Sequence, residues 1–208
     1  MQTKPVVIDI YHGDPVQDFA KVKASGIVGV IHKATQGGAV VDQSYASRRK
    51  LALAAGLKWG AYHFFDFTAS PAAQADHFLS VADADSDTLV AFDWENVGSR
   101  EPSAALAKIF LETIEAKLGR KAVIYSGNVA KEQIAGVDAY FGAHRLWLCQ
   151  YATQFRLQAS WSAPWLWQNN GDNYGPGPHS IPGISGLCDN NTIVPPMTVE
   201  RLLAEWAS

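Results

Sequence analysis

Short apolar runs alternate with stretches of helical period along most of this chain. The runs are four to eight residues long and rich in Val, Ile, Phe and Trp, which is typical of buried strands. Their alternation with helices predicts a parallel sheet, and eight such runs predict a closed barrel. The predicted strands are 6–10, 28–33, 58–64, 88–95, 122–126, 145–151, 164–168 and 186–189.

Helices are predicted mainly between the early strands. Gly26, Gly56 and Gly119 follow three of them, as is typical where helices end. After residue 126 the connections are rich in Gly, Pro, Asn and Ser, most clearly at 169–182, so we expect few helices in the last third. The predicted helices are 15–25, 43–55, 70–82, 103–118 and 198–206.

These elements predict an α/β fold, an irregular TIM-like barrel of eight strands with about five helices. The chain has 208 residues, of which 48% are hydrophobic, so it is long enough to bury a substantial core. No internal repeat and no linker interrupts the pattern. We therefore expect a single domain over residues 1–208.

Charge and composition exclude several classes of partner. The net charge is −3 and no stripe of Lys and Arg runs along the chain, so nucleic acid is not an expected partner. Cys149 and Cys188 each lie in an apolar run, which indicates buried thiols rather than a disulfide framework or a zinc site. No apolar run is long enough to span a membrane, and the first residues lack the pattern of a secretory signal. We expect synthesis without a signal peptide and no membrane insertion.

Acidic residues end three of the eight predicted strands. Side chains that act chemically in a parallel barrel sit at the carboxyl ends of its strands. Asp9 ends the first strand, Asp93 and Glu95 end the fourth, and Asp189 ends the eighth. Since the first and last strands of a closed barrel are neighbours, we expect the four acids to converge at one mouth.

Asp93 and Glu95 are the most informative pair. Two residues apart on an extended chain, they point to the same face, with alpha carbons roughly 6–7 Å apart. Mutual repulsion and the neighbouring Phe92 and Trp94 should raise the pKa of at least one carboxyl group, as a general acid requires. Glycosidic cleavage uses such a pair. By itself, however, Asp-x-Glu equally fits a strand end whose acids meet solvent.

Other polar and aromatic side chains also lie at or near the strand ends. Flat aromatic faces suit the apolar faces of sugar rings, although core packing explains any single ring as well. The candidate substrate-binding residues are Tyr62, His63, Tyr125, Trp147, Tyr151 and Gln168.

The order of these motifs resembles glycoside hydrolase family 25, the muramidase-type lysozymes of fungi, bacteria and bacteriophages. The resemblance runs nearly from end to end. The motifs that carry it are Ile8-Asp9-Ile10, Ile31-His32-Lys33-Ala34-Thr35, Gly60-Ala61-Tyr62-His63-Phe64, Phe92-Asp93-Trp94-Glu95, Ile124-Tyr125, Leu146-Trp147, Trp167-Gln168 and Asp189-Asn190-Asn191.

The resemblance implies a peptidoglycan muramidase that hydrolyses the β-1,4 bond between N-acetylmuramic acid and N-acetylglucosamine. Glu95 corresponds to the general acid/base, and Asp93 to the residue that assists the acetamido group of the substrate. Retention through an oxazolinium-like intermediate and an inverting route both remain open. Asp9 and Asp189 correspond to acids that position and tune the site.

The resemblance also implies the setting of the reaction. The expected partner is the peptidoglycan glycan strand, the expected state is a monomer, and neither a cofactor nor a metal is expected. Action is expected at the cell wall, in the periplasm or outside the cell, after release by a phage pore or a secretion system.

The chain departs from the family pattern in three places. Gln36 stands where the motif Lys-Ala-Thr-Glu-Gly has its glutamate, and Leu148-Cys149-Gln150 replaces the usual residues before the tyrosine of the sixth strand. The loop 169–182 is longer and richer in Gly and Pro than the family pattern, which leaves the shape of the substrate groove open.

Three other readings of the sequence remain. Asp9, His63, Asp93 and Asp189 could bind a divalent ion in a metal-dependent hydrolase, although no His-x-His follows the first strand. A barrel that binds cell-wall glycan without cutting it would need only the aromatic mouth. A chitinase-type hydrolase would need the run Asp-x-x-Asp-x-Asp-x-Glu, which the fourth predicted strand lacks.

Overall fold

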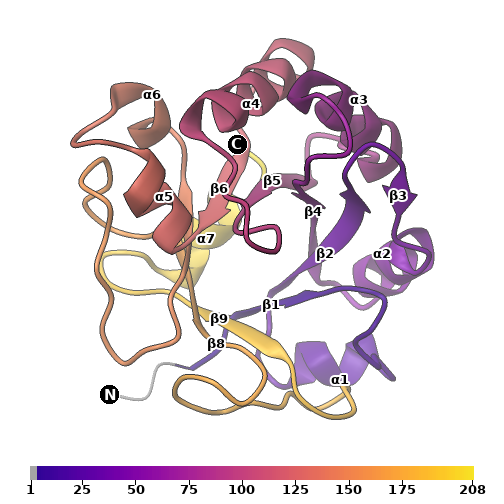
Figure 1. Cartoon of the computed structure of the whole chain (residues 1–208). Coiled ribbons are helices and arrows are strands. Elements are labelled where there is room, and N and C mark those ends of the chain that lie inside the picture. The colour runs from indigo at the N-terminus through magenta and orange to yellow at the C-terminus, as the bar shows by residue number, and fades with distance from the viewer. Residues whose placement is uncertain (1–3) are drawn as a thin grey trace.

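The computed structural model describes residues 4–208 as a barrel of strands surrounded by helices (Figure 1). The strands are β1 (Val7–Ile10), β2 (Gly29–Gln36), β3 (Val40–Val41), β4 (Lys58–Phe64), β5 (Leu89–Trp94), β6 (Val123–Ser126), β7 (Leu146–Cys149), β8 (Leu166–Asn170) and β9 (Asp189–Thr192). The helices are α1 (Phe19–Ala24), α2 (Tyr45–Ala54), α3 (Pro71–Ala82), α4 (Ala104–Leu118), α5 (Asn128–Gln133), α6 (Ala139–Gly142) and α7 (Val199–Ala204).

Eight strands close the barrel, as the sequence predicts. Their order is β1-β9-β8-β7-β6-β5-β4-β2, and β1 pairs with β2 to complete the ring, while the short β3 pairs only with β2. All pairings from β1 through β2 and β4 to β8 are parallel. The last strand, β9, is antiparallel to both β8 and β1.

The eighth predicted strand, 186–189, is misplaced. The strand begins at Asp189, where the prediction ended it, and runs the other way. Because β9 is antiparallel to β1, its first residue lies beside the end of β1, and Asp9 pairs in register with Asp189. The prediction was wrong both in the position and in the direction of this strand. Because the two differences compensate for each other, Asp189 still lies at the mouth at which β1 ends.

The helices after residue 126 are few and short, as expected. The five predicted helices occur in shortened form, and two short ones, α5 and α6, were not expected, so the described part of the chain has seven rather than about five. Asp138 begins α6 because its carboxylate accepts the backbone N–H groups of Tyr140 and Phe141. After β7 the chain is mostly loops, drawn in orange and yellow in Figure 1.

Strand alternation divides the core into two clusters. On β5, Leu89 and Ala91 belong to the cluster inside the barrel, whereas Val90 and Phe92 belong to the cluster between the barrel and the helices. Asp93 follows the same alternation as Leu89 and Ala91, so its carboxyl group is on the inward face. The carboxyl group of Asp93 therefore points into the barrel mouth.

Helix α7 closes the opposite end of the barrel. Leu202 and Trp206 join the inner cluster, and the Trp206 indole donates a hydrogen bond to the Trp59 carbonyl oxygen at 2.7 Å. A Cβ added to Gly29, at the start of β2, would lie 2.4 Å from the Trp206 ring. Of the helices found within residues 4–208, none is both long and apolar enough to cross a membrane.

Candidate active site

The structure brings all four predicted acids to one mouth of the barrel. Asp9 and Asp189 pair across β1 and β9, Asp93 lies on β5, and Glu95 follows that strand directly. Their charges act on one another: Asp9 and Glu95 both raise the pKa of Asp93, and Asp189 raises the pKa of Asp9 and of Glu95. Carboxyl groups that perturb one another in this way form one site.

Asp93 is the most isolated of the four. Its exposed fraction is 6%, and its Oδ1 atom has no hydrogen-bond partner within residues 4–208. Burial raises its pKa well above the usual value, the charges of Glu95 and Asp9 raise it further, and Lys33 opposes them. A buried carboxyl oxygen without a partner is costly, so this atom is available to a group that enters the mouth.

Glu95 faces open space. It lines a cavity of about 370 Å³ together with Asn128, Gln150 and Tyr151. Burial raises its pKa, Asp189 raises it further, and Lys33 lowers it. A raised pKa and a place at the wall of a cavity are two features that a general acid requires.

Asp9 is held by amides. The Gln168 side chain donates from Nε2 to both carboxylate oxygens at 3.0 and 2.9 Å, and Asn191 donates to Oδ1 at 2.7 Å. Tyr125 donates its hydroxyl to Gln168 Oε1 at 2.7 Å, which turns the amide nitrogen toward Asp9. Burial and Asp189 raise the pKa of Asp9, while the amide hydrogen bonds oppose them. Asp9 is therefore fixed in position.

Asp189 has a pKa of about 6. Burial is the main cause, the hydrogen bond from the Asp172 backbone N–H at 3.1 Å opposes it, and the charges of Asp172 and Asp14 add to the rise. Asp189 also borders a second cavity of about 370 Å³, lined among others by Asp9, Tyr62 and Asp172. The acids thus have one cavity on the Glu95 side and another on the Asp9 side.

The aromatic candidates form the floor and one wall of the mouth. Tyr125 and Trp147 are buried with ring centroids 4.5 Å apart, and Trp147 Nε1 donates to Asn191 Oδ1 at 2.5 Å. Tyr62 lines the second cavity, and its ring meets the Trp147 ring edge-on. Tyr151 is 40% exposed and lines the first cavity. Tyr62 and Tyr151 are consequently the aromatic candidates that border the open cavities.

His63, a candidate for substrate binding, lines neither of these two cavities. Strand alternation turns it outward, opposite to Tyr62, and its exposed fraction is 0%. Its ring nitrogens hydrogen-bond with Thr35 Oγ1 at 2.8 Å and Gln74 Oε1 at 3.0 Å, and the ring stacks on Phe110 of α4. His63 is a wall residue between the barrel and its helices.

Sequence reasoning gave no individual role to three residues that shape the site. Asn191 lies two positions after Asp189, so period-two alternation could have placed it on the same face. The charge of Lys33 lowers the pKa of Asp93 and of Glu95. In the sequence, Lys33 appeared only as part of a family motif. Asp172 comes from a loop, for which the sequence carried no signal.

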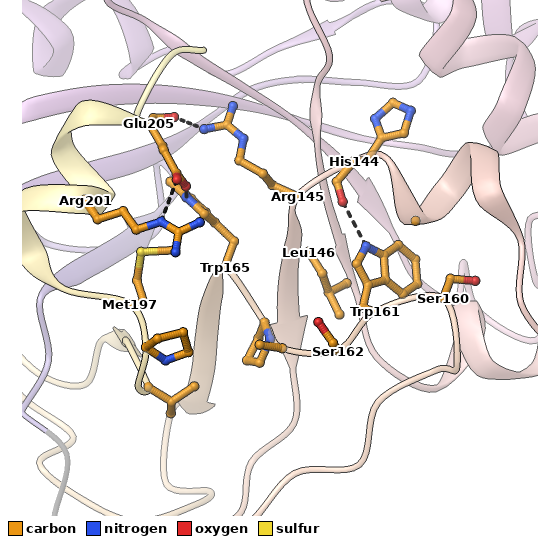
Figure 2. A pocket seen from close by; sticks show the side chains of 15 residues that line it. His144, Arg145, Leu146, Ser160, Trp161, Ser162, Trp165, Met197, Arg201 and Glu205 are labelled. Carbon is orange, nitrogen blue, oxygen red and sulfur yellow. Dashed lines mark hydrogen bonds and ion pairs between the residues drawn. The ribbon is translucent and has the colours of Figure 1, made fainter.

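A further cavity of about 350 Å³ lies far from the acids, between the start of β7 and α7 (Figure 2). Its polar side chains are bound to one another: Arg201 Nε donates to Glu205 Oε1 at 2.7 Å, and Trp165 Nε1 donates to Glu205 Oε2 at 3.0 Å. Arg145 also donates to the Glu205 backbone carbonyl. No predicted site residue lines this cavity, so we treat its contacts as structural.

A metal-dependent mechanism gains no support from the geometry. Across residues 4–208, no three His, Cys, Asp or Glu side chains are grouped so that they could hold a metal ion. His63, a ligand in that reading, is fully buried away from the acids.

The fold is a closed barrel of eight strands, and four carboxyl groups lie at one of its mouths. The family model for glycosyl hydrolases family 25 matches residues 8–177, and the chain belongs to that family. It is accordingly a glycoside hydrolase. An Escherichia coli K12 protein described as uncharacterized protein YegX is 30% identical over 193 residues, which is 90% of this chain and 67% of that protein. The chain thus spans about two thirds of that relative's length.

Solved structures show the same architecture. The bacterial lysozyme from Streptomyces coelicolor has a TM-score of 0.83 at 24% identity, with 97% of each chain covered, which is a likeness of fold. A muramidase from Acremonium alcalophilum has a TM-score of 0.78 at 27% identity, with 96% of this chain and 98% of that chain covered.

Proposed function

We propose that this chain hydrolyses the β-1,4 bond that follows N-acetylmuramic acid in peptidoglycan, with Glu95 as general acid and base. The single observation that carries this proposal is the placement of Glu95 at a cavity wall beside the buried, unpartnered Asp93. Glycosidic cleavage needs a proton donor at the leaving oxygen and a second carboxyl group near the anomeric carbon. The similar proteins described as lysozyme and muramidase support the choice of substrate.

The proposed reaction has two steps. First, the acetamido oxygen of the N-acetylmuramic acid ring forms a bond to its anomeric carbon, while Glu95 gives its proton to the departing oxygen of the next sugar. Asp93 accepts a hydrogen bond from the acetamido N–H and so supports its attack. Glu95 then takes a proton from water, which opens the oxazolinium ring and restores the acid with configuration retained.

The remaining residues position these groups. Gln168 and Asn191 fix Asp9 by hydrogen bonds. Burial and the charges of Glu95 and Asp9 raise the pKa of Asp93, and burial and the charge of Asp189 raise the pKa of Glu95. Tyr62 and Tyr151 contact the sugars at the two cavities, above the floor made by Tyr125 and Trp147.

The setting follows from the substrate. Glycan strands of peptidoglycan are the proposed partner, and we propose that a monomer acts at the cell wall without cofactor or metal. Release by a phage pore and delivery by a secretion system both remain predictions about how the enzyme reaches its substrate.

Mass spectrometry of the products tests the reaction. Purified sacculi incubated with the enzyme should yield fragments that end in reducing N-acetylmuramic acid, at a rate that chelators do not change. Fragments with reducing N-acetylglucosamine ends would make the enzyme a glucosaminidase, and anhydro ends would make it a lytic transglycosylase. Binding to sacculi without any new ends would indicate a glycan-binding barrel.

A further inference from the structure

Two exposed tyrosine rings lie beside the acidic mouth. Tyr174, in the loop between β8 and β9, is 68% exposed, and it stacks on Tyr151 with ring centroids 6.5 Å apart and an angle of 11° between the planes. Adjacent exposed aromatic rings beside a cavity offer apolar surface that a ligand can cover. Here a nearly parallel pair extends the wall of the cavity that Tyr151 shares with Glu95.

We propose that Tyr174 and Tyr151 form an additional glycan subsite, which binds one more sugar ring of the strand whose cleavage is proposed above. The inference rests on that proposed function and assigns Tyr174 a role in choosing the substrate. Flat aromatic faces fit the apolar face of a pyranose ring, and the tyrosine hydroxyl groups can bond to its hydroxyl groups.

The loop that carries Tyr174 lines one cavity and contacts Tyr151, which lines the other. Asp172, two residues earlier, lines the cavity on the Asp9 side and donates its backbone N–H to Asp189. Tyr151 lines the cavity on the Glu95 side. A sugar on the tyrosine pair would therefore continue a strand that passes across the acids.

Steric fit holds this loop against the mouth. A Cβ added to Gly171 would lie 2.5 Å from the Tyr151 hydroxyl oxygen and 2.8 Å from Asp189 Oδ1. Only a residue without a side chain can come so close to both groups. The turn that presents Tyr174 thus begins in direct contact with the aromatic wall and with one of the four acids.

Hydrogen bonds within the loop and to its neighbours fix its conformation. Tyr174 N donates to Gly171 O at 2.8 Å, and Gly171 N donates to Tyr174 O at 3.2 Å. Asn170 Nδ2 donates to the carbonyl oxygens of Pro176 at 2.7 Å and Pro178 at 3.1 Å, and Asn190 also donates to Pro178 O, at 3.0 Å. A platform fixed before the ligand arrives loses little conformational entropy on binding.

Charge favours an uncharged sugar over a stem peptide. Asp172 and Asp189 lie next to the turn, and Asp14 is close enough to raise the pKa of Asp189. Stem peptides carry carboxylates, and the lactyl group of N-acetylmuramic acid carries one once its peptide is removed; these acids repel both. An N-acetylglucosamine ring has no charge, so it is the sugar that we assign to the subsite.

Calorimetric titration of glycan strands into enzyme variants tests the subsite. The strands are sacculi from which an amidase has removed the stem peptides, and every variant carries Glu95→Gln so that turnover does not consume the ligand. Tyr174→Ala should weaken binding about 3- to 10-fold, the effect of losing one aromatic contact. Tyr174→Phe should retain most of the affinity because it keeps the ring. Leu51→Ala, at an exposed apolar residue of α2, is the control and should leave binding unchanged.

The outcomes separate this inference from the proposed function. Unchanged affinity in folded Tyr174→Ala, or no measurable binding by the Glu95→Gln parent, would overturn the subsite. A loss seen only with sacculi that retain their peptides would also overturn it, in favour of a peptide contact. The proposed function fails separately, if wild-type enzyme releases no reducing N-acetylmuramic acid ends.

Discussion

At the scale of single residues, two buried carboxyl groups in one mouth have different surroundings. Asp9 accepts hydrogen bonds from Gln168 and Asn191, whereas Asp93 Oδ1 has no partner within residues 4–208. Donated hydrogen bonds favour the charged form, and their absence favours the neutral one. The same residue type is therefore held by hydrogen bonds in one place and left without a partner at Oδ1 in another, which fits the different roles proposed for Asp9 and Asp93.

The raised pKa of Asp189 makes the stability of the folded protein depend on pH. Its pKa rises from the ordinary 3.8 to about 6, so between these values the folded protein binds a proton that the unfolded chain releases. The folded state consequently loses stability as pH rises through that window. Asp189→Asn should unfold at the same temperature as wild type below pH 4 but be more stable above pH 6, by on the order of 1–3 kcal/mol.

Melting curves from pH 3.5 to 7.5 test this prediction. Asp87→Asn, at an exposed carboxylate 3.5 Å from Lys58, is the matched control and should show no such gain. The rate profile should respond as well: Asp189 raises the pKa of Glu95, so its removal should move the high-pH loss of activity to lower pH. Equal melting temperatures for Asp189→Asn and wild type at every pH would contradict the prediction.

At the scale of elements, the sequence predicts the acids at the mouth better than it predicts the direction of the last strand. Apolar runs stop abruptly at Asp9 and at Asp93, which marks the mouth of the barrel without any structure. An antiparallel strand has the same alternation as a parallel one, so the direction of β9 could not be predicted. The burial of His63 could not be predicted, because a strand end presents both faces and only the fold decides which is open.

The loop after β8 gives a prediction at this scale. Gly171→Ala should force Tyr151 or Asp189 to move, since the new methyl group would lie under 3 Å from both side chains. We expect a loss of activity on sacculi of roughly tenfold or more, because small misplacements of positioning groups are costly. The melting temperature should change less than the activity, since residues 172–175, which follow Gly171 in the turn, are exposed.

Gly177→Ala in the same loop is the matched control. Its added methyl group would make only ordinary contacts with His179, 3.5 Å or more away, so activity should be retained. The measurement is the rate of sacculus cleavage by each of the two variants. If Gly171→Ala is as active as Gly177→Ala, the close approach of the loop to the mouth has no functional role.

At the scale of the whole molecule, the barrel is open at one end and plugged at the other. Trp206 of the C-terminal segment packs beneath the strands, against Gly29 and Trp59. The sequence predicted a helix over 198–206, which includes Trp206, but not its place, because amphipathic patterning does not identify the surface that a helix covers. The amide contacts around Asp9 were equally hidden, since Gln168 lies 159 positions from it in the chain.

Closure at one end leaves the acidic mouth as the place where a glycan strand meets the carboxyl groups, and Glu95 as the proposed proton donor there. The most direct test compares the rate of sacculus cleavage with the melting temperature for Glu95→Gln. The substitution keeps the shape of the side chain and removes its transferable proton. We predict a folded protein whose rate is lower by at least about 10²–10⁴-fold, the usual contribution of general acid catalysis. A folded Glu95→Gln enzyme that cleaves sacculi near the wild-type rate would contradict the account.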